Sequence, residues 1–223
     1  MAFTYASVMR QMTTILQDAG AVRWTAPEMK EWVDLALIDI YTAKPNAKVT
    51  VVQHPLVAGP RQTLRDEYAM VLAFLRNSTG GAIQMLDNLE TLDRWHPGWD
   101  SLPGVAKVQY VYHSQVTPRI FTVMPPATSA ASIEMEVAVA PTPGASPAAG
   151  AAADPTAYTA NVDLPDAYKT AVLHFALYRA FMKDGDNQAA TAQAQAHQAI
   201  AAKAIADMTA AEGAITAAAR ARA

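Results

Sequence analysis

Histidines and carboxylates are the side chains of this sequence that could carry chemistry, and only one short stretch spaces them as a site would. The histidines are scattered among different predicted elements: His54, His96, His113, His174 and His197. Glu90, Asp93 and His96 recur at helical spacing, which would place metal ligands on one face of a helix. Pro97 and Gly98 would end that helix beside His96, so we interpret the stretch as a solvated face leading into a turn.

Further motifs match chemical signatures only in part. The run Asp184-Gly185-Asp186-Asn187 begins like a calcium loop but lacks the later ligands and the closing glutamate. Asn77-Ser78-Thr79 fits the acceptor pattern for N-glycosylation, but no secretory signal accompanies it, and Gly80-Gly81 lacks the strand and helix context of a phosphate loop. We therefore predict no catalytic, cofactor-binding or metal-binding residue.

Pairs of carboxylates and a set of tryptophans fit structural roles better than catalytic ones. Asp34 and Asp39 flank an apolar helical stripe, and Glu134 and Glu136 share the polar face of a strand. Acid–base catalysis needs carboxylates that converge from separate elements, so we interpret both pairs as exposed polar faces. Tryptophans anchor cores and interfaces, and we assign that role to all four: Trp24, Trp32, Trp95 and Trp99.

Composition excludes several classes of function. Seventeen basic residues face twenty acidic ones, for a formal net charge of -3 without blocks of like charge, so no basic surface for tight nucleic-acid binding is expected. The absence of cysteine excludes disulfides and thiolate metal sites. With no signal peptide and no long apolar run, we expect a soluble protein without a membrane partner, assembled in a cytoplasm.

Hydrophobic periodicity predicts the elements of the first half of the chain. Apolar stripes indicate a helix from Tyr5 to Ala19, ended by Gly20, and a second helix that Thr25 and Glu28 open as a capping box and that closes before Pro45. Alternation predicts a strand over residues 49–55. Further apolar stripes predict helices over residues 64–76 and 86–95.

The second half changes character twice. Alternation predicts antiparallel strands over residues 106–113, 120–124 and 133–139. Residues 141–161 are mostly proline, alanine, glycine and threonine, which predicts a long loop that is either flexible or ordered by a contact outside the monomer. Helices follow from Pro165 to Met182 and, after a corner at residues 184–187, to about Ala219, with a thin seam of small residues: Ala201, Ala204, Met208, Ala211, Ile215 and Ala218.

Together these elements predict an α+β fold in which a small antiparallel sheet region is inserted into a helical bundle. Residues 1–45 and 164–223 supply the N- and C-terminal helices of the bundle. Residues 46–140 form the mixed α/β middle with antiparallel strands, and residues 141–163 form a low-complexity extended loop.

Local patterns along nearly the whole chain point to one family. They share a turn placed at the start or end of an element: Trp32 through Tyr41 followed by Pro45, Gly59-x-x-Gln62-x-Leu64, Leu92-Asp93 to Pro97-x-Trp99, Phe121-x-Val123-x-Pro125-Pro126, and Leu164-Pro165-Asp166-x-Tyr168 leading to Tyr178-Arg179-Ala180. With the order of the elements, these patterns resemble the head-to-tail adaptor, or tail tubular protein A, family of podophages. Arg65 departs from the pattern, because that turn is expected to carry proline.

The resemblance implies a structural virion protein without enzymatic activity or cofactor. Such a chain is expected to form a dodecameric ring at the head–tail interface, docked between the portal protein and the tail nozzle protein, with genomic DNA passing through the channel without sequence-specific binding. A chain without basic clusters suits a channel that must release DNA. Two alternatives remain open: another head-completion or tail-tube subunit, and a nucleotide- or metal-dependent enzyme whose site is assembled from distant residues.

Overall fold

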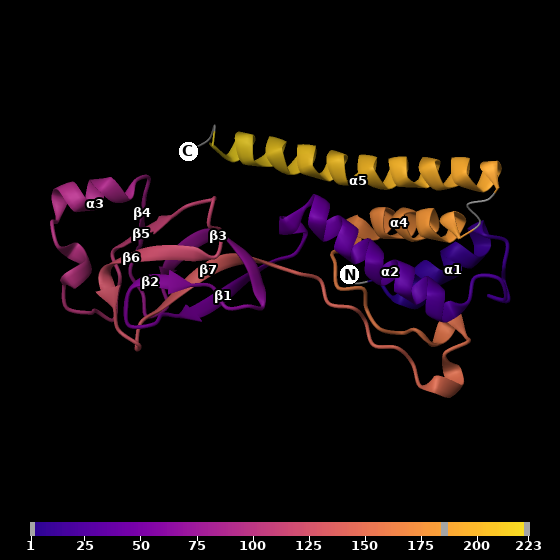
Figure 1. Cartoon of the computed structure of the whole chain (residues 1–223), viewed down its shortest axis with the longest axis horizontal. Coiled ribbons are helices and arrows are strands. Elements are labelled where there is room, and N and C mark those ends of the chain that lie inside the picture. Colours follow the sequence, from indigo (N-terminus) through magenta and orange to yellow (C-terminus); the bar gives the residue numbers. More distant parts are fainter. Residues whose placement is uncertain (1–2, 184–186, 221–223) are drawn as a thin grey trace. The chain divides into compact units, whose positions relative to one another are not determined.

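The chain divides into two compact units. The computed structural model describes residues 3–183 and 187–220, the last six as backbone alone. One unit contains Met1–Ala47 and Pro141–Ala223, and the other contains Lys48–Ala140. Helices and strands both occur, in agreement with the predicted α+β class (Figure 1).

Helices build the first unit. α1 (Tyr5–Ile15) and α2 (Ala26–Ala43) come before the inserted unit, and α4 (Lys169–Met182) and α5 (Gln188–Arg220) come after it. Short 3-10 turns lie at Pro45–Ala47, Ala149–Ala151, Pro155–Ala157 and Asp166–Tyr168. α4 packs against both α2 and α5. It therefore lies at the centre of the core, where Ala176, Leu177 and Ala180 are fully buried.

The start of α2 is as predicted, whereas α1 is shorter. The Glu28 carboxylate accepts hydrogen bonds from the backbone N–H and the hydroxyl of Thr25 at 3.0 and 2.9 Å, which confirms the capping box. α1 ends at Ile15 instead of Ala19, because the Asp18 carboxylate accepts three backbone N–H groups of residues 22–24 and organises a loop there. Those hydrogen bonds compete with a further helical turn.

Residues 141–163 make contacts within their own unit, and a contact outside the monomer stays a prediction. Tyr158 and Val162 are buried in the helical core. The backbone of Tyr5 donates to the Ala160 carbonyl at 3.0 Å, and the Tyr5 hydroxyl accepts from the Gly144 N–H at 2.8 Å. Two large side chains and a few hydrogen bonds to α1 therefore connect this alanine-rich segment to the helical unit.

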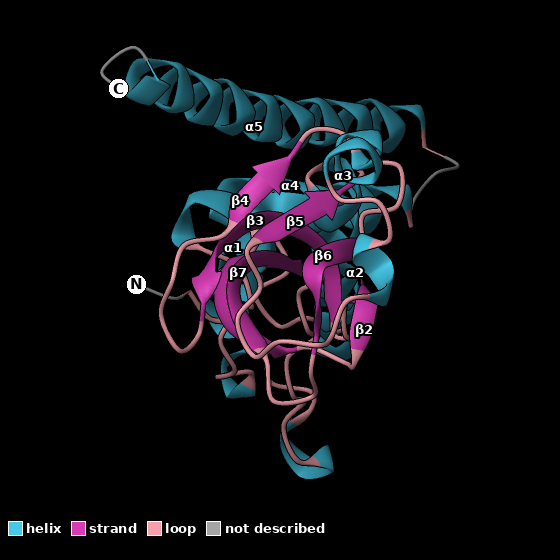
Figure 2. Ribbon diagram, turned by 90° about the vertical axis from the view of Figure 1, so that its left-hand side faces the viewer, coloured by secondary structure: helices cyan, strands magenta, loops and turns pink. Residues whose placement is uncertain are grey.

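Two sheets form the second unit and enclose its core. One sheet has the order β1-β7-β3, built from β1 (Val49–Pro55), β7 (Ser132–Val139) and β3 (Tyr68–Asn77). The other has the order β2-β6-β5-β4, built from β2 (Gly59–Thr63), β6 (Ile120–Ala127), β5 (Tyr110–His113) and β4 (Gln84–Leu86), shown in magenta in Figure 2. Their inner faces meet in one cluster that includes Phe121, Val123, Met135 and Val137.

The helix predicted over residues 64–76 is wrong, because the structure places strand β3 there. Three register shifts insert extra residues into β3 opposite β7, so that Tyr68, Val71, Phe74 and Asn77 pair with alternate residues of β7. Each bulge converts the two-residue repeat of a strand into a three-residue repeat. A bulged strand thereby imitated the apolar spacing of a helix.

A short helix covers the outer face of the second sheet. α3 (Leu89–Trp95) is shorter than predicted, because Gln84–Leu86 forms β4 and Asn88 caps the helix by accepting the Glu90 N–H at 2.9 Å. β4 is parallel to β5, whereas the prediction was of antiparallel strands alone. Leu92 and Trp99 pack on Met124 of β6. Within the described residues, no helix combines the length and apolarity needed to cross a lipid bilayer.

Candidate functional site

The histidines separate into three isolated side chains and one close pair. His54 is buried against Phe121, His113 contacts the Pro118 carbonyl at 3.2 Å, and His96 is exposed at the end of α3. His174 of α4 and His197 of α5 lie with their Nδ1 atoms 2.7 Å apart. Sequence could not reveal this pair, because the two residues come from antiparallel helices that only the tertiary fold aligns.

The electrostatics of the histidine pair favour neutral rings. A short contact between two Nδ1 atoms requires one ring to donate a proton and the other to accept it. Burial lowers the pKa of His174, and burial together with the His174 ring lowers the pKa of His197. Phe181 stacks on His197 with ring centroids 5.4 Å apart, so the pair belongs to the contact between α4 and α5.

The carboxylates singled out on α3 do not converge on a site. Asp93 accepts a hydrogen bond from the Trp99 indole at 2.8 Å. Glu90 is exposed and lies 3.8 Å from Arg94. Among the residues that the structure describes, no group of three or more metal-ligating side chains comes together. Asp93 therefore positions Trp99 over the sheet.

Asp34 and Asp39 are tied to neighbouring helices. The Asp34 carboxylate accepts a hydrogen bond from the Tyr5 hydroxyl at 2.6 Å and pairs with Lys30. Burial, and next the hydrogen bond to Asp34, raise the pKa of Tyr5. Asp39 forms an ion pair with Arg179 of α4. Both carboxylates hold helices in register, in place of the exposed polar face that we predicted.

Glu134 and Glu136 differ although they share a strand face. Glu134 binds Arg76 of the neighbouring strand β3 at 2.6 Å. Glu136 forms no ion pair or hydrogen bond with any side chain that the structure describes, and it is only half-exposed. Of these two carboxylates, Glu136 is therefore the one without a charged partner among the described side chains.

Two buried amides explain motifs that looked chemical or family-specific. Asn77 of the glycosylation pattern is buried, with its side chain bonded to the backbone N–H and carbonyl of Val108. Gln62 of the Gly59-x-x-Gln62 turn bonds to the backbone of Val57 and Gly59. These side chains replace missing backbone partners, a structural role.

The tryptophans fall into buried anchors and one exposed side chain. Trp24 is buried and donates its indole N–H to the Ala180 carbonyl of α4 at 3.0 Å. Trp99 is buried over the second sheet, and Trp32 packs partly buried against the helical core. Trp95 keeps 65% of its surface exposed. Tryptophan is among the residues most enriched where protein interfaces gain their affinity.

The corner before α5 is described only at its end. Residues 184–186 of the predicted corner lie outside the described residues. Asn187 caps α5 by accepting the Ala189 N–H at 2.9 Å. Along the predicted seam Ala201 is buried, Ala204 and Met208 are partly buried, and Ala211 is exposed, while the side chains of Ile215 and Ala218 are outside the described part.

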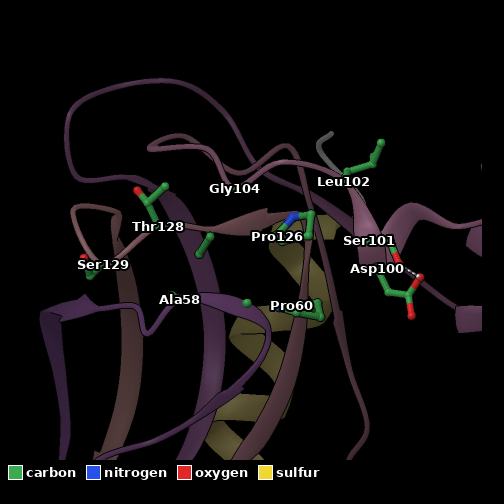
Figure 3. A pocket seen from close by; sticks show the side chains of 11 residues that line it. Ala58, Pro60, Asp100, Ser101, Leu102, Gly104, Pro126, Thr128 and Ser129 are labelled. Carbon is green, nitrogen blue, oxygen red and sulfur yellow. Dashed lines mark hydrogen bonds between the residues drawn. The ribbon is translucent and has the colours of Figure 1, made fainter.

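A shallow cavity of about 500 Å³ opens between loops of the second unit. Asp100 and Ser101 line one side, and Thr128 and Ser129 line the opposite side (Figure 3). Prolines, alanines and glycines supply most of the remaining lining. Asp100 is the one carboxylate around the cavity, and such a lining offers no acid–base pair.

The SU10 adaptor protein family matches residues 3–222, so the chain belongs to this family of bacteriophage structural adaptors, which is not a class of enzymes. The resemblance to phage adaptors is confirmed, and the protein is a component of the virion. A comparison with curated proteins finds no match.

Proposed function

We propose that this chain is the subunit of a ring-shaped head-to-tail adaptor that joins the portal protein to the tail nozzle protein. The family match over residues 3–222 is the observation that carries the proposal. A ring of twelve copies would continue the DNA channel between head and tail. Heterologous contacts between identical subunits close into such a ring when the rotation per subunit divides the circle.

The charge of the chain supports a channel that conducts DNA. The formal net charge is -3, and basic residues are dispersed along the sequence. Tight binding to duplex DNA depends on the release of counterions by clustered Lys and Arg. A wall without such clusters lets the genome move in either direction. DNA passage is then independent of sequence.

The two units suit different parts of this task. In this proposal the N- and C-terminal helices act as the stiff bundle of each subunit, centred on the buried face of α4. The β-rich unit contributes contacts between neighbouring subunits, because it carries exposed Val49, Val51 and Trp95. Val49 and Val51 lie on the same strand, and contiguous exposed apolar side chains mark surfaces that bind other proteins.

Native mass spectrometry and negative-stain imaging of the purified chain test the proposal. Twelve copies of the 23.8 kDa chain give a closed ring of about 286 kDa. The ring should bind purified portal protein and should leave a fluorescent DNA duplex unbound at about 0.15 M salt. A particle with a mass far from twelve copies, or stacked tubes in the images, would favour a head-completion or tail-tube subunit instead.

A further inference from the structure

The outer face of the β1-β7-β3 sheet carries an apolar stripe with one carboxylate in its middle. Val51 and Glu136 are cross-strand partners, and Glu136 in turn pairs with Ala73 of β3. The bulge beside Ala73 adds Leu72 to the same row. Val51 is 57% exposed and Leu72 is 38% exposed. Glu136 therefore lies between two exposed apolar side chains. We call this row of four residues the stripe: Val51, Glu136, Ala73 and Leu72.

The neighbouring row on the same face of the sheet contains a carboxylate that is neutralised by a cation. Glu134 pairs with Gln53 on one side and Arg76 on the other, and the Arg76 guanidinium neutralises it at 2.6 Å. Glu136 has no cation among the residues that the structure describes. A half-exposed carboxylate set in apolar surface favours a partner that offers a cation next to an apolar group.

α3 presents that combination on one short helix. Arg94 and Trp95 are adjacent in sequence, and their side chains are 80% and 65% exposed. Arg94 lies 3.8 Å from exposed Glu90, and an ion pair this exposed is a weak interaction in water. Arginine and tryptophan are the residues most enriched where protein interfaces gain their affinity.

The stripe and α3 lie on opposite faces of the β-rich unit. Leu92 and Trp99 pack α3 and the following turn on Met124, which points to the outer side of the second sheet. Phe121 and Val123 of the same strand point inward, to the core shared with Met135 of β7. Two different faces that complement each other form a heterologous, head-to-tail contact.

We propose that Arg94 and Trp95 of one copy dock on the stripe around Glu136 of the next copy. Arg94 forms an ion pair with Glu136, and the indole of Trp95 covers Val51 and Leu72. The inference rests on the proposed function, because it assigns the contact that repeats around the ring. In this arrangement the neighbouring copy covers the outer face of the β1-β7-β3 sheet.

Charge reversal tests the contact in the full-length chain. Glu136→Arg and Arg94→Glu should each raise the protein concentration needed for half-assembly by about tenfold or more, since they place like charges together. The double variant restores the pair with its polarity reversed and should assemble close to the wild-type concentration. Glu136→Gln should weaken assembly, whereas Glu134→Gln, the matched control beside Arg76, should leave it unchanged. Sedimentation velocity measures the assembled fraction.

A cross-link gives a second readout that does not depend on affinity. The native chain has no cysteine, so Val49→Cys and Glu90→Cys introduce one thiol at the edge of each face. A short bismaleimide should convert the double-cysteine ring into a ladder of covalent oligomers on a denaturing gel. Val116→Cys, at an exposed turn, replaces Val49→Cys in the control and should give little ladder.

The outcomes separate this inference from the proposed function. Recovery of assembly in the double variant, together with the ladder, supports the docking of α3 on the stripe. Rings that form equally well in both single charge reversals, or a double variant no better than the single ones, overturn it while leaving the ring intact as a proposal. A wild-type chain that stays monomeric at all concentrations overturns both. Circular dichroism of each variant verifies that it is folded.

Discussion

Asn77 gives the sharpest test of the β-rich unit, because one side chain supplies both partners of a buried peptide segment. Its Nδ2 donates to the Val108 carbonyl at 2.8 Å, and its Oδ1 accepts from the Val108 N–H at 2.9 Å. Val108 is 1% exposed, so water does not reach these groups in the folded chain. We predict that Asn77→Ala destabilises the unit substantially.

The magnitude follows from the two groups that lose their partner. Each buried donor or acceptor left unsatisfied costs about 1–3 kcal/mol. Two such groups at Val108 give a loss of roughly 2–6 kcal/mol, toward the lower end where water enters the space left by the amide. Asn46→Ala, which removes the same side chain from an exposed position, should change stability by less than about 0.5 kcal/mol.

Urea denaturation and hydrogen exchange together provide the assay. The shift in the free energy of unfolding is obtained from the midpoint at an unchanged slope. Exchange of peptides that contain Val108 should accelerate in Asn77→Ala, while peptides of α4 keep their protection, because the loss is local to one unit. Equal stability of the variant and the wild type would refute the assignment of Asn77 as a structural amide.

Two further predictions concern the helical unit. His174 and His197 both have a lowered pKa, so the unfolded chain takes up protons first as the pH falls below about 6.5. In thermal melts the wild type should therefore lose stability toward pH 5 more steeply than the double variant His174→Gln/His197→Gln. Melting temperatures that fall in parallel with pH in the two proteins would contradict this. Gly144→Ala would make the added methyl group overlap with the Tyr5 ring, and limited proteolysis should then cut residues 141–161 faster than in the wild type. An unchanged cutting rate would show that residues 141–161 accommodate the methyl group without losing their contacts to Tyr5.

Sequence patterns located most elements but misassigned one for a definite physical reason. The capping box at Thr25, the strand Val49–Pro55 and the strand around Met135 follow from local rules that the tertiary structure preserves. β3 breaks such a rule, because its bulges exist only opposite β7. The strand's three-residue repeat cannot be distinguished from helical spacing without its partner strand.

Residues that look alike in the sequence also differ in burial and pairing once the chain is folded. Trp95 and Trp99 are four residues apart and looked alike in the sequence, yet Trp99 is buried over Met124 and Trp95 is exposed. Glu134 and Glu136 alternate with apolar residues in one strand, and only the neighbouring strand supplies Arg76 to the first of them. Burial and pairing depend on residues that are distant in the sequence.

The sequence by itself determined the class of the protein, its family resemblance and the amphipathic elements, because composition, caps and periodicity act over short stretches of chain. The tertiary structure alone decided which polar groups remain without partners. It joined His174 to His197, tied Asp39 to Arg179 and gave Glu136 no ion pair with any side chain in the described part of the chain. Those outcomes depend on distances between elements, which hydrophobic packing sets only when the whole chain has folded.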